Sequence, residues 1–200
     1  MKIELYRILS KIFLGYLRVV AATGRLELVN EDRIRKNVMV GYWHGDSYCM
    51  QLILQRIARN QDKINVIVTA DKRGDVIEAM LRPSKARALR LPDGLKMRPF
   101  LQGLITFVKE EDGILAVALD GPTGPLHEPK KLLFLLASES QKPVVCIHFQ
   151  YKGVLRIRRR WDHYVIPLPF CKIRAIVDDL GTVTKEDLKN FNELKKAIKF

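Results

Sequence analysis

Short apolar runs alternate with amphipathic segments along most of the chain, and this alternation constrains the fold more than any other feature. The β-branched run Ile64–Thr69 and the apolar runs 114–119 and 144–150 are typical of buried strands. Helical spacing of apolar residues separates them, at 45–59, 76–81, 100–110 and 130–140. Because strands that alternate with helices build a sheet covered on both faces, the sequence predicts an α/β fold with a mixed, partly parallel sheet flanked by helices.

The two ends of the chain complete this arrangement. Shorter strands are predicted at 25–29, 38–42, 154–160 and 171–177, and a charged amphipathic helix at 184–200. Between two of these strands lies WDHYVIPLPF, which we interpret as an aromatic and proline corner. Its Asp162 and His163 are adjacent, so their side chains diverge and we do not expect them to form a catalytic pair. We expect an N-terminal helix over 1–24 and one domain over 25–200.

The N-terminal segment 1–24 has apolar residues at helical spacing and basic residues largely on the other side. No apolar run reaches the roughly 20 residues that span a bilayer. The segment also lacks the small-residue cleavage site of a secretory signal, so we expect it to be retained. Periodicity leaves two interpretations open: the helix lies in a membrane interface, or its apolar face packs on the core.

The charge and the cysteines narrow the class of partner and the compartment. Lys and Arg number 35 against 22 Asp and Glu, a formal net charge of +13, so the surface should attract polyanions such as anionic lipid, nucleic acid or phosphorylated small molecules. Cys49, Cys146 and Cys171 are widely spaced in apolar sequence, which indicates buried reduced thiols. The four histidines lack ligand spacing, so we expect no metal and no other cofactor.

A histidine stands where the apolar run 38–42 ends and a helix begins, in VGYWHGD. In α/β sheets, ligands bind beyond the carboxyl ends of strands, where helix N-termini point their free N–H groups. A neutral imidazole at such a junction can accept a proton from a hydroxyl. His44 is therefore a candidate general base, although an ordinary hydrogen-bonded histidine fits the pattern equally well.

Three further segments follow predicted strands or lie between elements. LDGPTGP, which contains Asp120, Gly121 and Thr123, fixes a rigid turn after the run 114–119, and it is either a ligand-binding segment or a tight structural turn. In ADKRGD, Arg73 is a candidate phosphate ligand. Asp75 of the same segment is placed to cap the next helix. Arg90 belongs to the cationic stretch 90–99, which we expect to be either a phosphate site or a solvated loop.

Together, WHGD, ADKRGD, LDGPTGP with its Pro-Lys-Lys continuation, KPVVCIHF and WDHYVIPLPF resemble a small bacterial lysophospholipid acyltransferase-like family. That family belongs to the superfamily of glycerolipid and lipid A acyltransferases. The resemblance implies a glycerol-3-phosphate acyltransferase-like fold and acyl transfer from acyl-CoA or acyl carrier protein to a hydroxyl of a lysophospholipid or glycolipid. It also implies peripheral association with an anionic membrane surface, at the cytoplasmic face of the inner membrane.

The resemblance assigns roles to several of these residues. His44 matches the histidine of the H-x4-D motif, the general base, while Asp120 and Gly121 fall where the superfamily binds the polar or phosphate group of the acceptor. Arg90 lies in the region of another phosphate-binding arginine. The motif's acid is absent, because Cys49 stands at its position. A general base needs a partner that fixes its tautomer, so we expect Asp71 or Asp75, from the next strand end, to supply it.

Two other functions remain open on the sequence. The chain could be a non-catalytic lipid- or phosphate-binding module that has lost the acidic partner of the histidine. Nucleic-acid binding is suggested by the charge and by the basic stretch RIRRRW at 156–161. We consider it the weaker prediction, because it leaves His44 and LDGPTGP unexplained.

Overall fold

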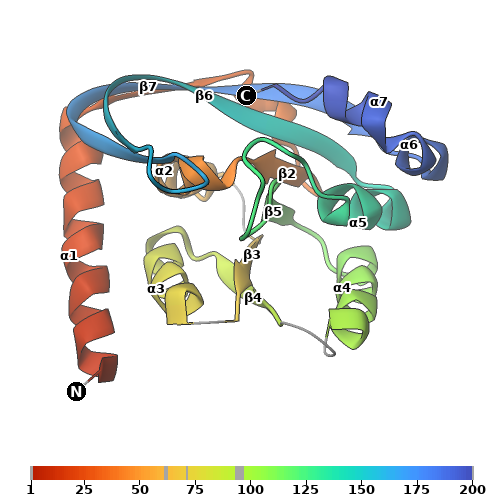
Figure 1. Cartoon of the computed structure of the whole chain (residues 1–200), viewed down its shortest axis with the longest axis horizontal. Helices are drawn as coiled ribbons and strands as arrows, with labels where there is room; N and C mark the ends of the chain where they lie inside the picture. The colour runs from red at the N-terminus through yellow and green to blue at the C-terminus, as the bar shows by residue number, and fades with distance from the viewer. Residues whose placement is uncertain (1, 61–62, 71, 93–96, 200) are drawn as a thin grey trace.

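A computed structural model describes residues 2–60, 63–70, 72–92 and 97–199. Its strands are β1 (Arg25–Val29), β2 (Met39–Tyr42), β3 (Ile64–Thr69), β4 (Arg87–Leu91), β5 (Ile114–Ala118), β6 (Pro143–Ile157) and β7 (Tyr164–Thr182). Within the described residues they form one seven-stranded sheet in the order β1-β7-β6-β2-β5-β3-β4 (Figure 1).

The sheet is mixed and mostly parallel. Strands β6, β2, β5, β3 and β4 run in one direction, each parallel to its neighbours in that group. Strand β7 is antiparallel to β6, and β1 is parallel to β7. The predicted α/β fold with a mixed, partly parallel sheet is therefore confirmed.

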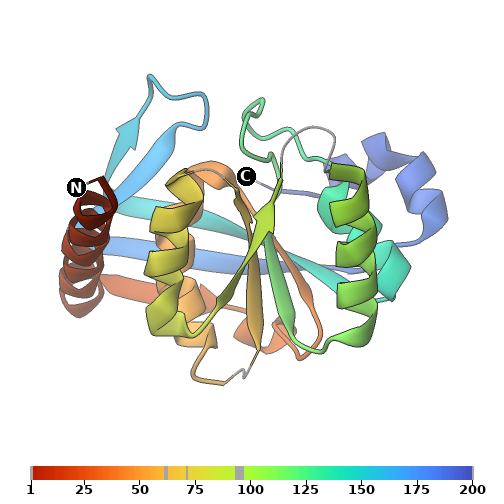
Figure 2. The ribbon, with the colours of Figure 1, turned by 90° about the horizontal axis from the view of Figure 1, so that it is seen from below.

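Helices cover both faces of the sheet (Figure 2). One face carries α1 (Lys2–Thr23), α2 (Ser47–Ile57) and α3 (Lys72–Leu81), and the other carries α4 (Met97–Glu110), α5 (Leu132–Ser140), α6 (Lys185–Lys189) and α7 (Phe191–Lys196). Successive strand residues point to opposite faces, so each face has its own core. Val40 and Ala116 belong to the first core, and their chain neighbours Met39 and Val117 to the second.

Strand β4 was missed by the sequence analysis, which read Arg90 as part of a loop. It is the last strand of the sheet order, and its residues are exposed or half-buried. An edge strand of this kind lacks the continuous apolar run that marks a buried strand, so the basic residues of RALRL obscured it. The predicted helix over 184–200 also differs, because it is divided into α6 and α7 at Asn190.

The predicted corner at 161–170 is wrong for most of its length. Two strands predicted at 144–150 and 154–160 are one strand, β6, with a register shift between Lys152 and Val154. A turn then leads into β7 at Tyr164, so most of WDHYVIPLPF belongs to a long hairpin. Prolines are tolerated there because β1 pairs with β7 only at 172–176, which leaves one side of Pro167 without a strand neighbour.

Helix α1 packs on this hairpin through its second half. Leu17 and Val20 are buried, and the hydroxyl of Tyr16 donates a hydrogen bond of 2.6 Å to the backbone oxygen of Pro167. Ile12 and Val19 of the same helix are exposed. Among the residues that the structure describes, no helix has both the length and the apolar character needed to cross a membrane.

Candidate functional site

His44 opens a single 3-10 turn, His44–Asp46, that joins the carboxyl end of β2 to α2. The turn directs the imidazole toward a cavity, whose lining includes His44. The side chain is 25% exposed, which leaves part of the ring accessible to a ligand. The predicted location of His44, at a strand end beside a potential ligand site, is therefore what the structure shows.

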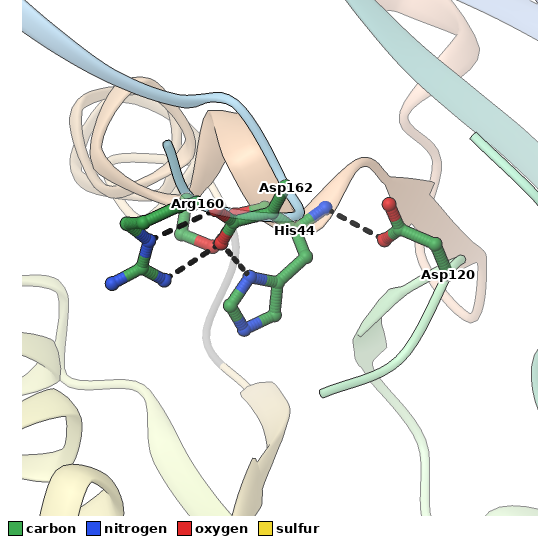
Figure 3. Close-up of polar contacts among 5 residues, drawn as sticks. His44, Asp120, Arg160 and Asp162 are labelled. Carbon is green, nitrogen blue, oxygen red and sulfur yellow. Dashed lines mark hydrogen bonds and ion pairs between the residues drawn. The ribbon is translucent and has the colours of Figure 1, made fainter. Parts of the chain in front are cut away.

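The carboxylate of Asp162 lies against this imidazole. Its Oδ2 atom is 2.8 Å from Nδ1 of His44, and the Asp162 side chain is fully buried. Arg160 donates two hydrogen bonds to the same carboxylate, from Nε to Oδ1 at 2.9 Å and from Nη2 to Oδ2 at 2.7 Å. Figure 3 shows the three side chains in line, with the second ring nitrogen of His44 on the side away from Asp162.

These contacts keep Asp162 ionised. Burial by itself would raise the pKa of the carboxyl group, but the hydrogen bonds from Arg160 and His44 outweigh it and hold the pKa below its usual range. A carboxylate accepts hydrogen bonds only, so Nδ1 of His44 carries the proton in this pair. The neutral imidazole then has its lone pair on Nε2, which is the atom that a general base requires.

Asp120 holds the other side of the histidine, through the backbone. Its Oδ1 accepts a 2.9 Å hydrogen bond from the backbone N–H of His44 (Figure 3). The residue is 0% exposed, and burial raises the pKa of its carboxyl group, partly offset by that hydrogen bond. Asp120 is not among the residues that line the cavity. In this structure the contact of the carboxylate is with the backbone of His44, which it positions, and the predicted role of Asp120 in substrate binding stays a prediction.

The strand order explains why these two carboxylates reach His44. Strand β2 lies between β5 and β6, so the segments that follow those two strands meet the turn that follows β2. Asp120 comes directly after β5, and Asp162 lies in the turn at the end of β6. Strand β3, which leads to the predicted partner Asp75, is separated from β2 by β5.

Asp75 is therefore not the partner of His44. Its Oδ1 accepts a 2.8 Å hydrogen bond from Arg90, whose guanidinium also pairs with Glu78. The other predicted partner, Asp71, lies outside the described residues. Asp162 takes this role, a residue that we had assigned to a packing corner because its neighbour His163 could not share its direction. A signal in the sequence could have identified Asp162. Arg160 stands two residues before it, and an arginine and an aspartate at this spacing can form an ion pair within one turn.

Two glycines allow the motifs to pack against one another. A Cβ atom on Gly45 would lie 2.1 Å from the backbone oxygen of Asp162, so only glycine lets the hairpin turn approach the helix start. A Cβ on Gly124, in LDGPTGP, would lie 2.5 Å from the Trp161 ring. Gly124 also has a φ of 69°, which disfavours other residues. WHGD, LDGPTGP and WDHY thus form one unit.

The cavity beside His44 has a volume of about 340 Å³. Its lining is mostly apolar, and it includes residues of α2, of α3 and of several strands. The apolar side chains that line it include those of Ile67, Ile77, Met80, Leu91, Val117, Ile157 and Ile166. Polar groups are fewer, and they include His44, Gln51 and Arg160. A mostly apolar cleft with a few convergent polar groups is typical of small-molecule sites.

The remaining predicted ligand residues have different positions. Gly121 lines the cavity, whereas Thr123 is exposed in the LDGPTGP turn and is not in the lining. Arg90 forms ion pairs with Asp75 and Glu78, and it is not among the residues that line the cavity. Arg73 belongs to α3, and its side chain lies outside the described part of the structure.

Cys49, at the place of the missing motif acid, is completely buried in the first core. Burial also raises the pKa of its thiol well above the ordinary value, so the group stays neutral. All three cysteines are buried and free, as predicted. Within the described ranges, no group of three or more His, Cys, Asp or Glu side chains could hold a metal ion.

The fold and the site define an α/β protein with a histidine–aspartate pair at the carboxyl end of its sheet. No family model and no solved structure matches the chain. It is similar to an uncharacterized protein of Rickettsia prowazekii (strain Madrid E), with 21% identity over 202 residues that cover 98% of this chain and 90% of that protein. The similarity thus extends over nearly the whole length of both chains.

Proposed function

We propose that this protein is an acyltransferase that moves an acyl group from a thioester of coenzyme A or acyl carrier protein to a hydroxyl of a lysophospholipid or related membrane lipid. The observation that carries the proposal is the buried Asp162–His44 pair at the edge of a mostly apolar cavity. Such a cavity suits an acyl chain, and the pair suits a hydroxyl nucleophile. The resemblance of the five motifs to the lysophospholipid acyltransferase-like family supports the same reaction.

In this mechanism Nε2 of His44 takes the proton of the acceptor hydroxyl as its oxygen attacks the thioester carbonyl. A C–O bond forms, and the tetrahedral intermediate then collapses with cleavage of the C–S bond. The leaving thiolate takes the proton back from the imidazolium, so the products are an ester and a free thiol. Asp162 fixes the tautomer of His44 and stabilises its transient positive charge.

Arg160 and Asp120 act on the pair rather than on the substrate. The guanidinium of Arg160 keeps Asp162 ionised through its two hydrogen bonds. Asp120 fixes the backbone at His44. A base that is held at two points needs little reorganisation when the reaction begins.

The binding-module alternative depended on the absence of an acidic partner for His44, and Asp162 removes that argument. The binding module remains one of the outcomes that the thiol-release assay distinguishes. The basic stretch that suggested nucleic-acid binding includes Arg160, which is engaged with Asp162, and Arg156, whose guanidinium lies over the Tyr151 ring at 5.4 Å. No observation at the site favours that function.

We also propose that the acceptor is reached from the surface of an anionic bilayer. Leu168 and Phe170 of β7 are 40% and 77% exposed, and Val19 of α1 is 50% exposed. Phe170 and Val19 are close, because Thr23 bonds to both: its Oγ1 accepts from the Phe170 N–H and donates to the Val19 oxygen. Exposed apolar groups on a chain with a formal net charge of +13 suit an interface with anionic lipid.

The test of this membrane proposal is cosedimentation with vesicles of phosphatidylcholine alone and with added phosphatidylglycerol. Phe170→Asp should weaken binding to the anionic vesicles. Arg35→Gln, which changes one exposed charge elsewhere, should weaken it less. Equal binding by the wild type and Phe170→Asp would rule out this surface.

The test of the activity measures free thiol released from acyl-CoA and acyl carrier protein donors, with and without lysophospholipid or glycolipid acceptors. Acceptor-dependent release that His44→Ala abolishes would support the proposal. Release that does not need an acceptor would indicate thioester hydrolysis instead. No release by a folded protein that binds vesicles would overturn catalysis and favour the binding module.

A further inference from the structure

The cavity beside His44 contains a buried amide that the proposed mechanism does not use. Gln51 of α2 lines the cavity and is only 5% exposed. Its Oε1 has no hydrogen-bond partner among the described residues. Buried polar groups in native proteins are almost always hydrogen-bonded, so an amide oxygen without a partner in a ligand cavity indicates a group that the ligand brings.

The position of Gln51 relative to His44 follows from the helix. His44, Ser47, Tyr48 and Gln51 recur at the spacing of one helical face, and all four line the cavity. His44 begins the 3-10 turn that leads into α2, and a rise of about 1.5 to 2 Å per residue places the Gln51 backbone roughly 10 Å further along the axis. His44 is the more exposed of the two, so Gln51 marks the inner part of the cavity.

The chemistry around Gln51 decides what the ligand must be. The cavity walls are mostly aliphatic, contributed by Ile67, Ile77, Met80 and Leu91 among others. A charged ligand group would not be matched by such walls, because an unpaired charge is costly to bury. An amide oxygen accepts a hydrogen bond, so the group it needs is a neutral donor. A hydroxyl on an otherwise aliphatic chain meets both conditions.

We propose that the cavity selects an acyl chain with a hydroxyl in its middle part, which donates to Oε1 of Gln51. The proposal rests on the function proposed above and names the substrate class more narrowly. With an unsubstituted chain, the Gln51 oxygen stays buried without a partner, which lowers affinity. A hydroxyl next to the thioester carbonyl would lie near His44, about two helical turns from Gln51, and would not reach it.

The test uses binding rather than turnover, so that it does not depend on the reaction. Stearic acid, 3-hydroxystearic acid and 10-hydroxystearic acid compete with a fluorescent fatty acid for the wild-type protein. We expect 10-hydroxystearic acid to bind about 10-fold more tightly than the other two, the ratio for one hydrogen bond to a buried acceptor. Gln51→Leu and Gln51→Met should abolish this preference and bind stearic acid at least as well.

Gln55→Leu is the matched control. Gln55 lies one turn further along α2 and lines a different cavity, so this variant should keep the wild-type preference. Circular dichroism and thermal unfolding of each variant verify that it is folded.

Each other outcome is decisive. Equal binding of stearic and 10-hydroxystearic acid by the wild type, or a preference that survives both Gln51 substitutions, would overturn the inference and leave the acyltransferase proposal intact. Failure of all three fatty acids to displace the probe would overturn the inference too. Combined with no thiol release, that failure would also overturn the proposed function.

Discussion

Nδ1 of His44 lies 2.8 Å from Oδ2 of Asp162, a residue 118 positions later in the chain. The two residues come from segments that are far apart in the sequence. The sheet brings the turn after β6, which carries Asp162, to the start of α2, where His44 lies. Asp162 is buried and bound twice by Arg160, so its charge and direction are set before any substrate arrives. The arrangement combines a fixed carboxylate with a partly exposed imidazole.

Asp162→Asn is expected to lower kcat of acyl transfer by about 10²- to 10⁴-fold, because the imidazole loses the charge that fixes its tautomer and stabilises its protonated form. Thiol release under saturating donor and acceptor measures the loss. A ¹⁵N NMR spectrum of the imidazole should show the proton on Nδ1 in the wild type and a mixture of tautomers in the variant.

The matched control is Asp75→Asn, which removes one of the two carboxylates, Asp71 and Asp75, that the sequence predicted for this role. Asp75 is paired with Arg90, so the variant should keep the wild-type rate within about 2-fold, as for a surface ion pair. A rate loss in Asp75→Asn as large as in Asp162→Asn would contradict this account of the site.

Arg160→Gln is expected to move the acid limb of the pH profile of kcat/KM to higher pH. Hydrogen bonds from Arg160 help hold the pKa of Asp162 below its usual range, so losing them raises that pKa. The carboxylate is then protonated at a higher pH, and its support of His44 is lost earlier as the pH falls. The guanidinium is 46% exposed, so solvent screening limits the shift. Arg159→Gln, in the same turn, should leave the limb in place.

Gly45→Ala is expected to destabilise the fold by about 3 kcal/mol, the scale of a steric clash in a packed region. The new Cβ would lie 2.1 Å from the Asp162 backbone oxygen, so the hairpin turn must move away from His44. Urea unfolding measures the change. Gly103→Ala in α4 is the control, since its Cβ has no neighbour within 4 Å and alanine favours a helix. A Gly45→Ala protein as stable as the control would contradict the close approach.

Asp46→Asn is expected to change how stability depends on pH. Burial raises the pKa of Asp46 from 3.8 to about 6, although the Tyr151 hydroxyl donates a hydrogen bond to the carboxylate. The folded state therefore binds more protons than the unfolded state between these two values, and this group's contribution to stability is lost as the pH rises through about 6.

In the variant that loss should disappear, which stabilises the protein at pH 7.5 by on the order of 1 kcal/mol. Thermal unfolding at pH 4.5 and 7.5 measures the difference between wild type and variant. The exposed Asp32→Asn serves as the control and should follow the wild type. A parallel pH dependence in the wild type and Asp46→Asn would refute the assignment.

The sequence by itself determined the elements that depend on local pattern. Apolar runs such as Ile64–Thr69 identified β3 with its observed bounds, because a buried strand needs apolar side chains on both faces. The end of the apolar run 38–42 likewise placed His44 at the carboxyl end of a strand. The edge strand β4 and the hairpin strand β7 were missed or misread, because their polar residues and prolines are tolerated only where a strand lacks a neighbour.

Only the tertiary structure decided which carboxylates meet His44. Asp71 and Asp75 were plausible partners because the strand that follows β2 in the chain was assumed to lie beside it. The sheet instead places β5 and β6 on either side of β2, and so brings Asp120 and Asp162 to the histidine. Strand order depends on long-range pairing and on the packing of both sheet faces, and these interactions leave no trace in the local spacing of residues.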